Sequence, residues 1–298
     1  MPAIVSHCLL AEKVLARLKK RFPDQHFHET AFYWGCSGPD LFFCHRMLPI
    51  LPGRSLHSFG LKMHNMPADE MLNYLVRFAQ RHNDEIAMSY ALGFVTHYAY
   101  DSIAHPFILY FSDLQEYLRP EKSASAWHHQ IESALDTILL YHQRHTSICR
   151  FRLQATAPID LKVNYTIARM LQGYLLTVCG HGAYLSEIVQ AQKDWHLSLV
   201  ALNDRFGVKY QIVKYGEKLL GLPQLLSPVF RRNCPDLSYD PANLHHRTWY
   251  DPSSKSESSA SFFDLTHQAE QLSLSMISTY LSGSYLTPEQ CSASFSGH

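Results

Sequence analysis

An apolar segment in the first half of the chain carries three ionisable side chains at intervals of four residues, and this pattern limits how the chain can fold. Residues 93–106 are rich in aliphatic and aromatic side chains, yet they contain His97, Asp101 and His105. A step of four residues advances only about 40° around an α-helix, so these side chains share one stripe over two turns. Burying imidazole and carboxylate groups without partners is costly. The segment therefore predicts a buried helix whose polar stripe contacts a cation.

Side chains of the same chemistry occur elsewhere in the first half of the chain. His128 and Glu132 repeat the four-residue spacing on the next predicted helix. The remaining candidates are His7, Asp40 and His64. Taken singly, each has an ordinary explanation as a surface pair, a turn residue or a core histidine. Together they offer more nitrogen and oxygen ligands than one ion needs, and a set without cysteine is typical of catalytic zinc sites.

Helical periodicity recurs along most of the chain. Helices are predicted over 6–21, 67–82, 84–111, 123–145, 160–179, 182–205, 208–220 and 262–281, with a kink near Pro106. The segments 31–65 and 221–261 are rich in breakers and predict loops. No alternating strand pattern extends beyond a few residues. The predicted fold class is all-α, a multi-helix bundle.

The domain organisation follows from length and from where the ligand-type residues lie. With 298 residues, 46% of them hydrophobic, the chain can form a substantial core. We expect a metal-binding helical core over 1–150 and a helical C-terminal part over 151–298 packed on it. A serine-rich segment near 253–261 is predicted to be flexible, and the residues after 281 are predicted to fray.

Charge and cysteine usage exclude several classes of protein. Lysine plus arginine and aspartate plus glutamate each number 26, so there is no basic surplus for generic nucleic-acid binding. No stretch approaches the roughly 20 apolar residues of a membrane-spanning helix. The seven cysteines form no C-x-x-C pair, which argues against a disulfide framework and against a thiolate zinc finger. Since no secretory signal is evident, we expect a cytoplasmic location.

The order of the ligand-type residues resembles that of a known superfamily. The order is His7, Gly-Pro-Asp40, His64, His97-x3-Asp101-x3-His105 and His128-x3-Glu132. It resembles the zinc-dependent phospholipase C and S1/P1 nuclease superfamily, and more closely the bacterial zinc-dependent phospholipase C-like proteins. The resemblance covers about residues 1–145. It implies a helical bundle that holds two or three zinc ions and hydrolyses phosphate esters.

The resemblance also implies a ligand set for each ion. Asp40, His64, His97 and Asp101 would hold one zinc, and His105, His128 and Glu132 a second. His7 would hold a third, bridged by Asp101 and completed by the amine and carbonyl of the N-terminal residue. Pro2 lies five residues before His7, as the ligating N-terminal residue does in the nucleases, and a Met-Pro start normally loses its methionine. We therefore predict Pro2 as a ligand.

The sequence departs from the superfamily pattern in three places. The phospholipases usually separate the helix aspartate from the next histidine by six residues, whereas Asp101 and His105 are four apart. Leu41 follows Asp40, where the choline-selective phospholipase has an aromatic residue. Phe43 stands where the nucleases have a basic residue. The last two differences argue against choline selectivity and against a nuclease, respectively.

Candidate substrate contacts lie near the predicted ligands and in the second half of the chain. By the resemblance, Asp40 would also accept a proton during catalysis. Arg46 is a candidate for binding a phosphate oxygen, because a guanidinium donates two parallel hydrogen bonds. Phe42, Phe59 and Trp249 are candidates for an apolar wall against an acyl chain or a base.

The sequence supports one leading function and leaves two alternatives open. The leading function is a phospholipase C-like phosphodiesterase that uses a multinuclear zinc site to activate water. Its partner would be a phosphoester substrate such as a phospholipid, met in a peripheral contact with a membrane and without a transmembrane segment. The alternatives are a nuclease-like enzyme, for which no strong nucleic-acid signature is present, and a non-catalytic zinc-stabilised helical module.

Overall fold

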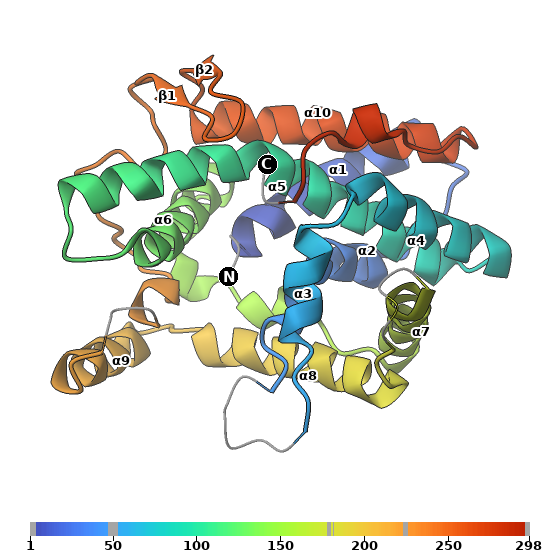
Figure 1. The fold of residues 1–298 in the computed structure, drawn as a ribbon, viewed down its shortest axis with the longest axis horizontal. Coiled ribbons are helices and arrows are strands. Elements are labelled where there is room, and N and C mark those ends of the chain that lie inside the picture. The colour runs from blue at the N-terminus through green and yellow to red at the C-terminus, as the bar shows by residue number, and fades with distance from the viewer. Residues whose placement is uncertain (1–3, 47–52, 178–179, 181, 223–225, 296–298) are drawn as a thin grey trace.

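The fold is all-α, as predicted (Figure 1). The computed structural model describes residues 4–46, 53–177, 180, 182–222 and 226–295. The α-helices are α1 (Ile4–Arg21), α2 (Glu29–Gly35), α3 (His57–His64), α4 (Ala68–His82), α5 (Glu85–Leu118), α6 (Ala124–Arg144), α7 (Leu161–Thr177), α8 (Leu185–Leu202), α9 (Val208–Leu219) and α10 (Phe262–Leu281). The 3-10 helices are η1 (Gly38–Phe42), η2 (Ile148–Arg150), η3 (Leu153–Thr156), η4 (Ser227–Val229) and η5 (Pro288–Cys291). The strands β1 (Trp249–Tyr250) and β2 (Glu257–Ser258) form one short antiparallel hairpin.

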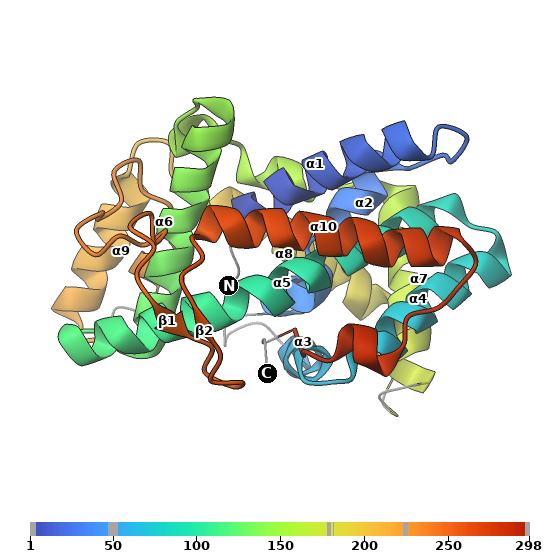
Figure 2. The ribbon, with the colours of Figure 1, turned by 90° about the horizontal axis from the view of Figure 1, so that it is seen from above.

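Helix α5 crosses the centre of the molecule and contacts α2, α4, α6 and α10. In Figure 2, α10 runs between α1 and α5. The side chain of Asp84 caps α5 by accepting a hydrogen bond from the amide of Ala87 at 3.0 Å. The helix continues through Pro106 to Leu118, beyond the predicted end at 111. Phe107 and Phe111 lie on this part of the helix and are buried. Their packing therefore outweighs the cost of the backbone hydrogen bond that is lost at Pro106.

Two glycines let α2 and α5 cross at backbone contact. A Cβ atom added to Gly93 would lie 2.0 Å from the carbonyl oxygen of Phe32. One added to Gly35 would lie 2.2 Å from the carbonyl oxygen of Tyr90. Only glycine fits at either position. The crossing brings the residue after α2, Cys36, beside the polar stripe of α5.

The breaker-rich segment 31–65 contains more helix than predicted, since α2, η1 and α3 all lie partly or wholly within it. Each of these helices is at most eight residues long, too short to show a helical period in the sequence. Pro39 stands in the first turn of η1, where a missing amide costs nothing. The breakers therefore begin short helices here instead of excluding them.

The prediction that the residues after 281 fray is wrong. Leu286, Cys291 and Phe295 are all buried. The side chain of Asn73 on α4 donates a hydrogen bond to the carbonyl of Leu286 at 2.9 Å and accepts one from its amide at 3.1 Å. The C-terminal segment therefore packs back onto the helical core.

Buried residues from both predicted parts of the chain form one hydrophobic core. The division at residue 150 into two units stays a prediction. The serine-rich segment forms the β1–β2 hairpin, where Asp251 accepts hydrogen bonds from the amides of Ser253 and Ser254, and Ser261 caps α10. None of the helices in the described ranges combines the length and apolar character that a bilayer crossing requires.

Candidate metal centre

The polar stripe of α5 is the base of the candidate centre. His97 and Asp101 are buried within it, and the side chain of His105 is 14% exposed. The Nε2 atom of His97 lies 3.0 Å from Oδ2 of Asp101. The Nδ1 atom of His105 lies 4.0 Å from Oδ1 of the same carboxylate. Asp101 therefore sits between two histidines of its own helix.

Helix α1 adds His7 to the stripe. Its Nε2 atom lies 3.0 Å from Oδ1 of Asp101, and its ring stacks on that of His97 with centroids 4.6 Å apart. The preceding residue, Ser6, donates hydrogen bonds from its amide and its hydroxyl to Oδ1 of Asp136, both at 2.8 Å. Asp136 lies on α6 and forms a buried ion pair with Arg231 at 2.9 Å. This polar cluster fixes the start of α1 against α6.

Asp40 and His64 also approach His97, from η1 and α3. Oδ1 of Asp40 lies 3.2 Å from Nε2 of His64, and its Oδ2 lies 3.8 Å from Nε2 of His97. Asp40 belongs to η1, which begins at Gly38 with φ +51°. A Cβ atom on Gly38 would lie 2.2 Å from the ring of His97. Glycine before Pro39 is therefore required by the turn and by the histidine beneath it.

Helix α6 supplies the last pair. Nε2 of His128 lies 3.2 Å from Oε1 of Glu132, and the rings of His128 and His105 stack with centroids 5.8 Å apart. Glu132 is buried, and Nδ1 of His129 lies 3.6 Å from its second oxygen. The four-residue spacing of Asp101 and His105 therefore still brings His105 to this pair.

These side chains form three groups that could each hold a metal ion. The groups are His7, His97 and Asp101; Asp40, His64 and His97; and His105, His128 and Glu132. Within each group, the candidate ligand atoms lie within 4.8 Å of one another. The convergence predicted from the sequence is thus present for all eight side chains. The predicted ligand Pro2 lies outside the described residues.

Three backbone carbonyls orient the histidine rings. The Nδ1–H groups of His64, His97 and His105 donate to the carbonyl oxygens of Gly60, Cys36 and Phe295 at 2.7, 3.0 and 2.7 Å, respectively. Because a carbonyl only accepts, each bond places the lone pair of the neutral imidazole on Nε2, the nitrogen that a metal would bind. Sequence reasoning missed these partners. Every residue carries a backbone carbonyl, so no residue type in the sequence marks the ones that bind a histidine. Phe295 lies 190 positions from His105.

The charges in the centre shift several pKa values. Burial raises the pKa of Asp101, but His97, His105 and His7 outweigh it and hold that pKa well below its usual range. Burial also opposes the charged form of His97, yet Asp101 and Asp40 raise its pKa to about 9. Burial raises the pKa of Glu132, but His128 more than compensates and lowers it well below its usual range. The carboxylates are thus ionised and need positive charge nearby.

The residues present fit zinc. Asp40 Oδ2 and Glu132 Oε2 are buried atoms without a hydrogen-bond partner in the described structure, while Nε2 of His97 and Oδ2 of Asp101 lie 3.0 Å apart. Buried acceptors left unpaired cost free energy, and a cation among them removes that cost. The nitrogen and oxygen donor set suits Zn²⁺, and the carbonyl partners hold the rings as metal-binding histidines require.

A comparison with protein families agrees with this geometry. A family model described as zinc dependent phospholipase C matches residues 6–180, more than half of the chain. The chain belongs to this family. No curated protein and no solved structure matches it. The matched range contains all eight ligand-type side chains of the three groups, whereas α8, α9 and α10 follow it.

In this zinc-dependent phospholipase C family member, the predicted apolar substrate contacts lie inside the protein core. Phe42, Phe59 and Trp249 are each at most 4% exposed. Trp249 packs edge-on against Phe107 with ring centroids 5.5 Å apart and donates a hydrogen bond to the carbonyl of Ala260. A role in binding substrate stays a prediction for these three aromatic residues.

Arg46 is half-buried and follows η1. Its backbone has φ +49°, and its amide donates a hydrogen bond to Asp194 on α8 at 3.0 Å. A Cβ atom on Gly53 would lie 1.6 Å from a terminal nitrogen of its guanidinium, so the side chain lies against that glycine. Phosphate binding by Arg46 stays a prediction.

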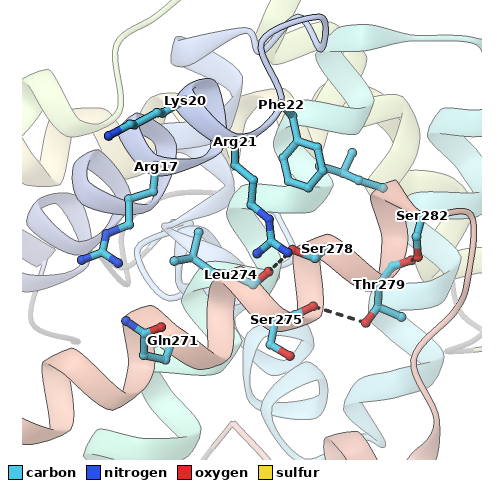
Figure 3. A pocket seen from close by; sticks show the side chains of 11 residues that line it. Arg17, Lys20, Arg21, Phe22, Gln271, Leu274, Ser275, Ser278, Thr279 and Ser282 are labelled. Atoms are coloured by element: carbon cyan, nitrogen blue, oxygen red, sulfur yellow. Dashed lines mark hydrogen bonds between the residues drawn. The ribbon is translucent and has the colours of Figure 1, made fainter.

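A cavity of about 1090 Å³ lies away from the three groups, between the C-terminal ends of α1 and α10 (Figure 3). Arg17, Lys20 and Arg21 line one side, and serine and threonine hydroxyls line the other. Arg17 is paired with Glu270. The hydroxyls of Ser278 and Thr279 donate to carbonyls of their own helix, as Figure 3 shows. These hydroxyls are therefore not free to donate to an anion, and the geometry favours no ligand here.

Proposed function

We propose that this chain hydrolyses phosphodiesters of phospholipids with two or three zinc ions held by the three groups. The observation that carries the proposal is the convergence of eight nitrogen and oxygen donors from α1, η1, α3, α5 and α6. Two buried carboxylate oxygens among them, Asp40 Oδ2 and Glu132 Oε2, have no hydrogen-bond partner in the described structure, which a purely structural cluster would provide. Membership of the zinc-dependent phospholipase C family supports the same chemistry.

The proposed ligand sets follow the sequence resemblance, and the distances among the eight described side chains support them. Asp40, His64, His97 and Asp101 hold one zinc; His105, His128 and Glu132 hold a second; and His7, Asp101 and Pro2 hold a third. In support, Asp101 lies within 4.0 Å of three histidines, more than any other carboxylate of the groups. A carboxylate in this position is suited to bridge two ions.

Zinc in such a site would lower the pKa of a bound water towards neutrality and stabilise the oxygen that leaves phosphorus. The chain's own residues supply the remaining functions. Asp40 accepts a proton at Oδ2, the oxygen that has no hydrogen-bond partner in the structure. The carbonyls of Gly60, Cys36 and Phe295 keep the imidazole rings in one orientation. The buried walls around His97 keep bulk water from competing with the substrate.

The direct test compares two substrate classes with and without metal. Zinc-loaded protein is incubated with phosphatidylcholine–phosphatidylglycerol vesicles and, separately, with single-stranded DNA, and the released phosphorus species are followed by ³¹P NMR. We expect a phosphorylated head group from the vesicles, no release after chelation, and recovery when zinc is returned. Cleavage of DNA alone would indicate the nuclease alternative. Stoichiometric zinc without hydrolysis of either substrate would indicate a non-catalytic helical module.

Matched variants connect the activity to the site. Asp40→Asn removes the proposed proton acceptor, so turnover should fall by about 100-fold or more. Asp113→Asn changes an exposed carboxylate on α5 outside the three groups, so it should leave turnover unchanged. Equal activity of the two variants would contradict the role of Asp40.

A further inference from the structure

Helix α9 turns its apolar stripe away from the protein. Val208, Ile212, Tyr215 and Leu219 lie within about 60° of one another around the helix axis. Their exposed fractions are 55%, 65%, 70% and 76%. An amphipathic helix on a globular protein normally buries such a stripe. The exposed stripe of α9 is therefore an unusual surface that calls for a partner.

The opposite side of α9 attaches the helix through polar contacts. Glu217 is the buried residue of this helix. Its Oε1 atom accepts hydrogen bonds from the amides of Leu226 at 2.7 Å and Ser227 at 3.2 Å. The guanidinium of Arg232 lies over the ring of Tyr210, 5.0 Å from its centroid. These contacts fix which side of the helix faces solvent.

The apolar surface extends beyond both ends of the helix. Phe206, two residues before it, is 81% exposed, and Leu220, directly after it, is 71% exposed. We call the four stripe residues together with Phe206 and Leu220 the α9 apolar face. Isolated exposed apolar residues are ordinary, but a contiguous set of this kind marks an interaction site.

Cations flank the α9 apolar face. Lys209 lies about 90° from the middle of the stripe on one side, and on the other side Lys218 lies about 90° and Lys214 about 130° from it. Lys209 donates hydrogen bonds to three carbonyls at the end of α8. Neither Lys214 nor Lys218 has an acidic partner among the described residues. Arg205 adds a fourth positive charge, and the acidic Glu217 points inwards.

We propose that the α9 apolar face docks on an anionic phospholipid surface, with the stripe placed among the acyl chains and with Lys214 and Lys218 against the head groups. The pattern of an apolar stripe between cations is that of helices that lie in the membrane interface. A second copy of the chain fits less well, because a symmetric contact would bring the lysines of one copy against those of the other. The choice of lipid as partner rests on the proposed function.

The docking surface is joined to the metal centre through α6. The hydroxyls of Ser133 and Thr137 on α6 donate hydrogen bonds to the carbonyls of Phe230 and Arg232, which follow η4. Helix α9 contacts η4, and η4 contacts α6. Since α6 also carries His128 and Glu132, η4 and α6 connect α9 to one proposed zinc group.

The test measures binding separately from hydrolysis. Vesicles of phosphatidylcholine with about 30% phosphatidylglycerol are sedimented with the full-length protein, wild type or carrying Ile212→Asp with Leu219→Asp. We expect the double variant to bind at least about tenfold more weakly, because two charges enter the stripe. Lys214→Glu with Lys218→Glu should weaken binding to these vesicles and reduce its salt dependence. Leu161→Asp, at another exposed leucine, and Lys20→Glu, at a distant lysine, serve as matched controls and should bind as wild type does.

The outcomes separate this proposal from the proposed function. Unchanged vesicle binding by the Ile212 and Leu219 double variant would overturn the docking role of α9. Sedimentation velocity that shows a wild-type dimer, lost in the same variant, without vesicle binding, would overturn it in favour of a second copy. Wild-type protein that binds vesicles through α9 but fails to hydrolyse a water-soluble phosphodiester would leave the docking proposal standing and count against the proposed activity alone.

Discussion

At the scale of single residues, Asp101 is a buried carboxylate surrounded by histidines. Its carboxylate is buried and lies within 4.0 Å of three histidines, one from α1 and two from α5. Its pKa is held below the usual range against the effect of burial. A group under such constraint is more often functional than structural, because a packed apolar side chain would stabilise the fold equally well.

Asp101→Asn is expected to lose at least one zinc per chain. The amide keeps the shape of the carboxylate but removes the negative charge that would bridge two ions. Elemental analysis of the purified variant, compared with wild type and with Asp113→Asn, measures the loss directly. Full zinc content in folded Asp101→Asn would show that the carboxylate is not a ligand.

The raised pKa of His97 predicts a pH-dependent stability of the zinc-free protein. Burial lowers this pKa, but Asp101 and Asp40 raise it from 6.5 to about 9. A histidine with a raised folded-state pKa stabilises the fold fully below pH 6.5 and loses that contribution as the pH rises through about 9. We expect the zinc-free protein to lose on the order of 2–3 kcal/mol of stability across this window.

Thermal unfolding between pH 6 and 9.5, with zinc removed, tests this expectation. His97→Gln should remove most of the slope, whereas His82→Gln, at an exposed position, should keep it. Zinc should also remove the slope, because the metal binds the neutral imidazole in place of a proton. If stability falls with pH equally in the wild type and in His97→Gln, the pH dependence does not come from His97.

At the scale of elements, the crossing of α2 and α5 decides the shape of the centre. Gly35 and Gly93 allow backbone contact, and the contact places the carbonyl of Cys36 at 3.0 Å from His97. Helix α2 has only seven residues, so its position comes from this contact and not from its own helical stability. The orientation of a proposed zinc ligand thus depends on two residues without side chains.

Gly93→Ala is expected to destabilise the protein by about 1–3 kcal/mol and to weaken zinc binding. The new methyl group would lie 2.0 Å from a backbone oxygen of α2, so the two helices must separate and His97 loses its carbonyl partner. Chemical denaturation and zinc titration measure the two effects. The matched control is Gly216→Ala on α9, where nothing lies within 4 Å of the added methyl group. That control should be neutral or slightly stabilising.

At the scale of the whole molecule, the C-terminal segment returns to the metal centre. The ring of Phe295 is fully buried, 5.8 Å from that of His64 and 5.9 Å from that of His97, and its carbonyl accepts from His105. The centre is therefore completed by residues that lie far beyond the range matched by the family. The fold of this chain couples the segment around Phe295 to α3 and α5.

Phe295→Ala is expected to cost about 3–5 kcal/mol of stability, because it leaves a cavity against two proposed zinc ligands. The backbone carbonyl that orients His105 remains in this variant. The group of His105, His128 and Glu132 should therefore still bind zinc once the protein is folded. Phe206→Ala, at an exposed phenylalanine, is the matched control and should change stability little. Urea denaturation compares the two. Similar stability of both variants would mean that the C-terminal segment does not pack on the centre in solution.

The helices and their boundaries were largely predictable from the sequence. Long periodic segments such as α4, α6 and α10 begin and end within a few residues of the predicted bounds. A stripe of His97, Asp101 and His105 on one helix is likewise a local property, because it depends only on the helical repeat. The family resemblance added the order of the remaining ligand-type residues.

Other features required the tertiary structure. The short helices α2 and α3, the buried C-terminal segment and the carbonyls that orient the rings depend on contacts between residues far apart in the chain. The outward direction of the stripe on α9 is of the same kind, since periodicity shows that a helix is amphipathic but not which side the protein covers. Sequence alone determined which residues share a helix face and what chemistry they carry. Only the packing of the whole chain decided what each face meets, because burial and long-range contacts form when distant segments come together.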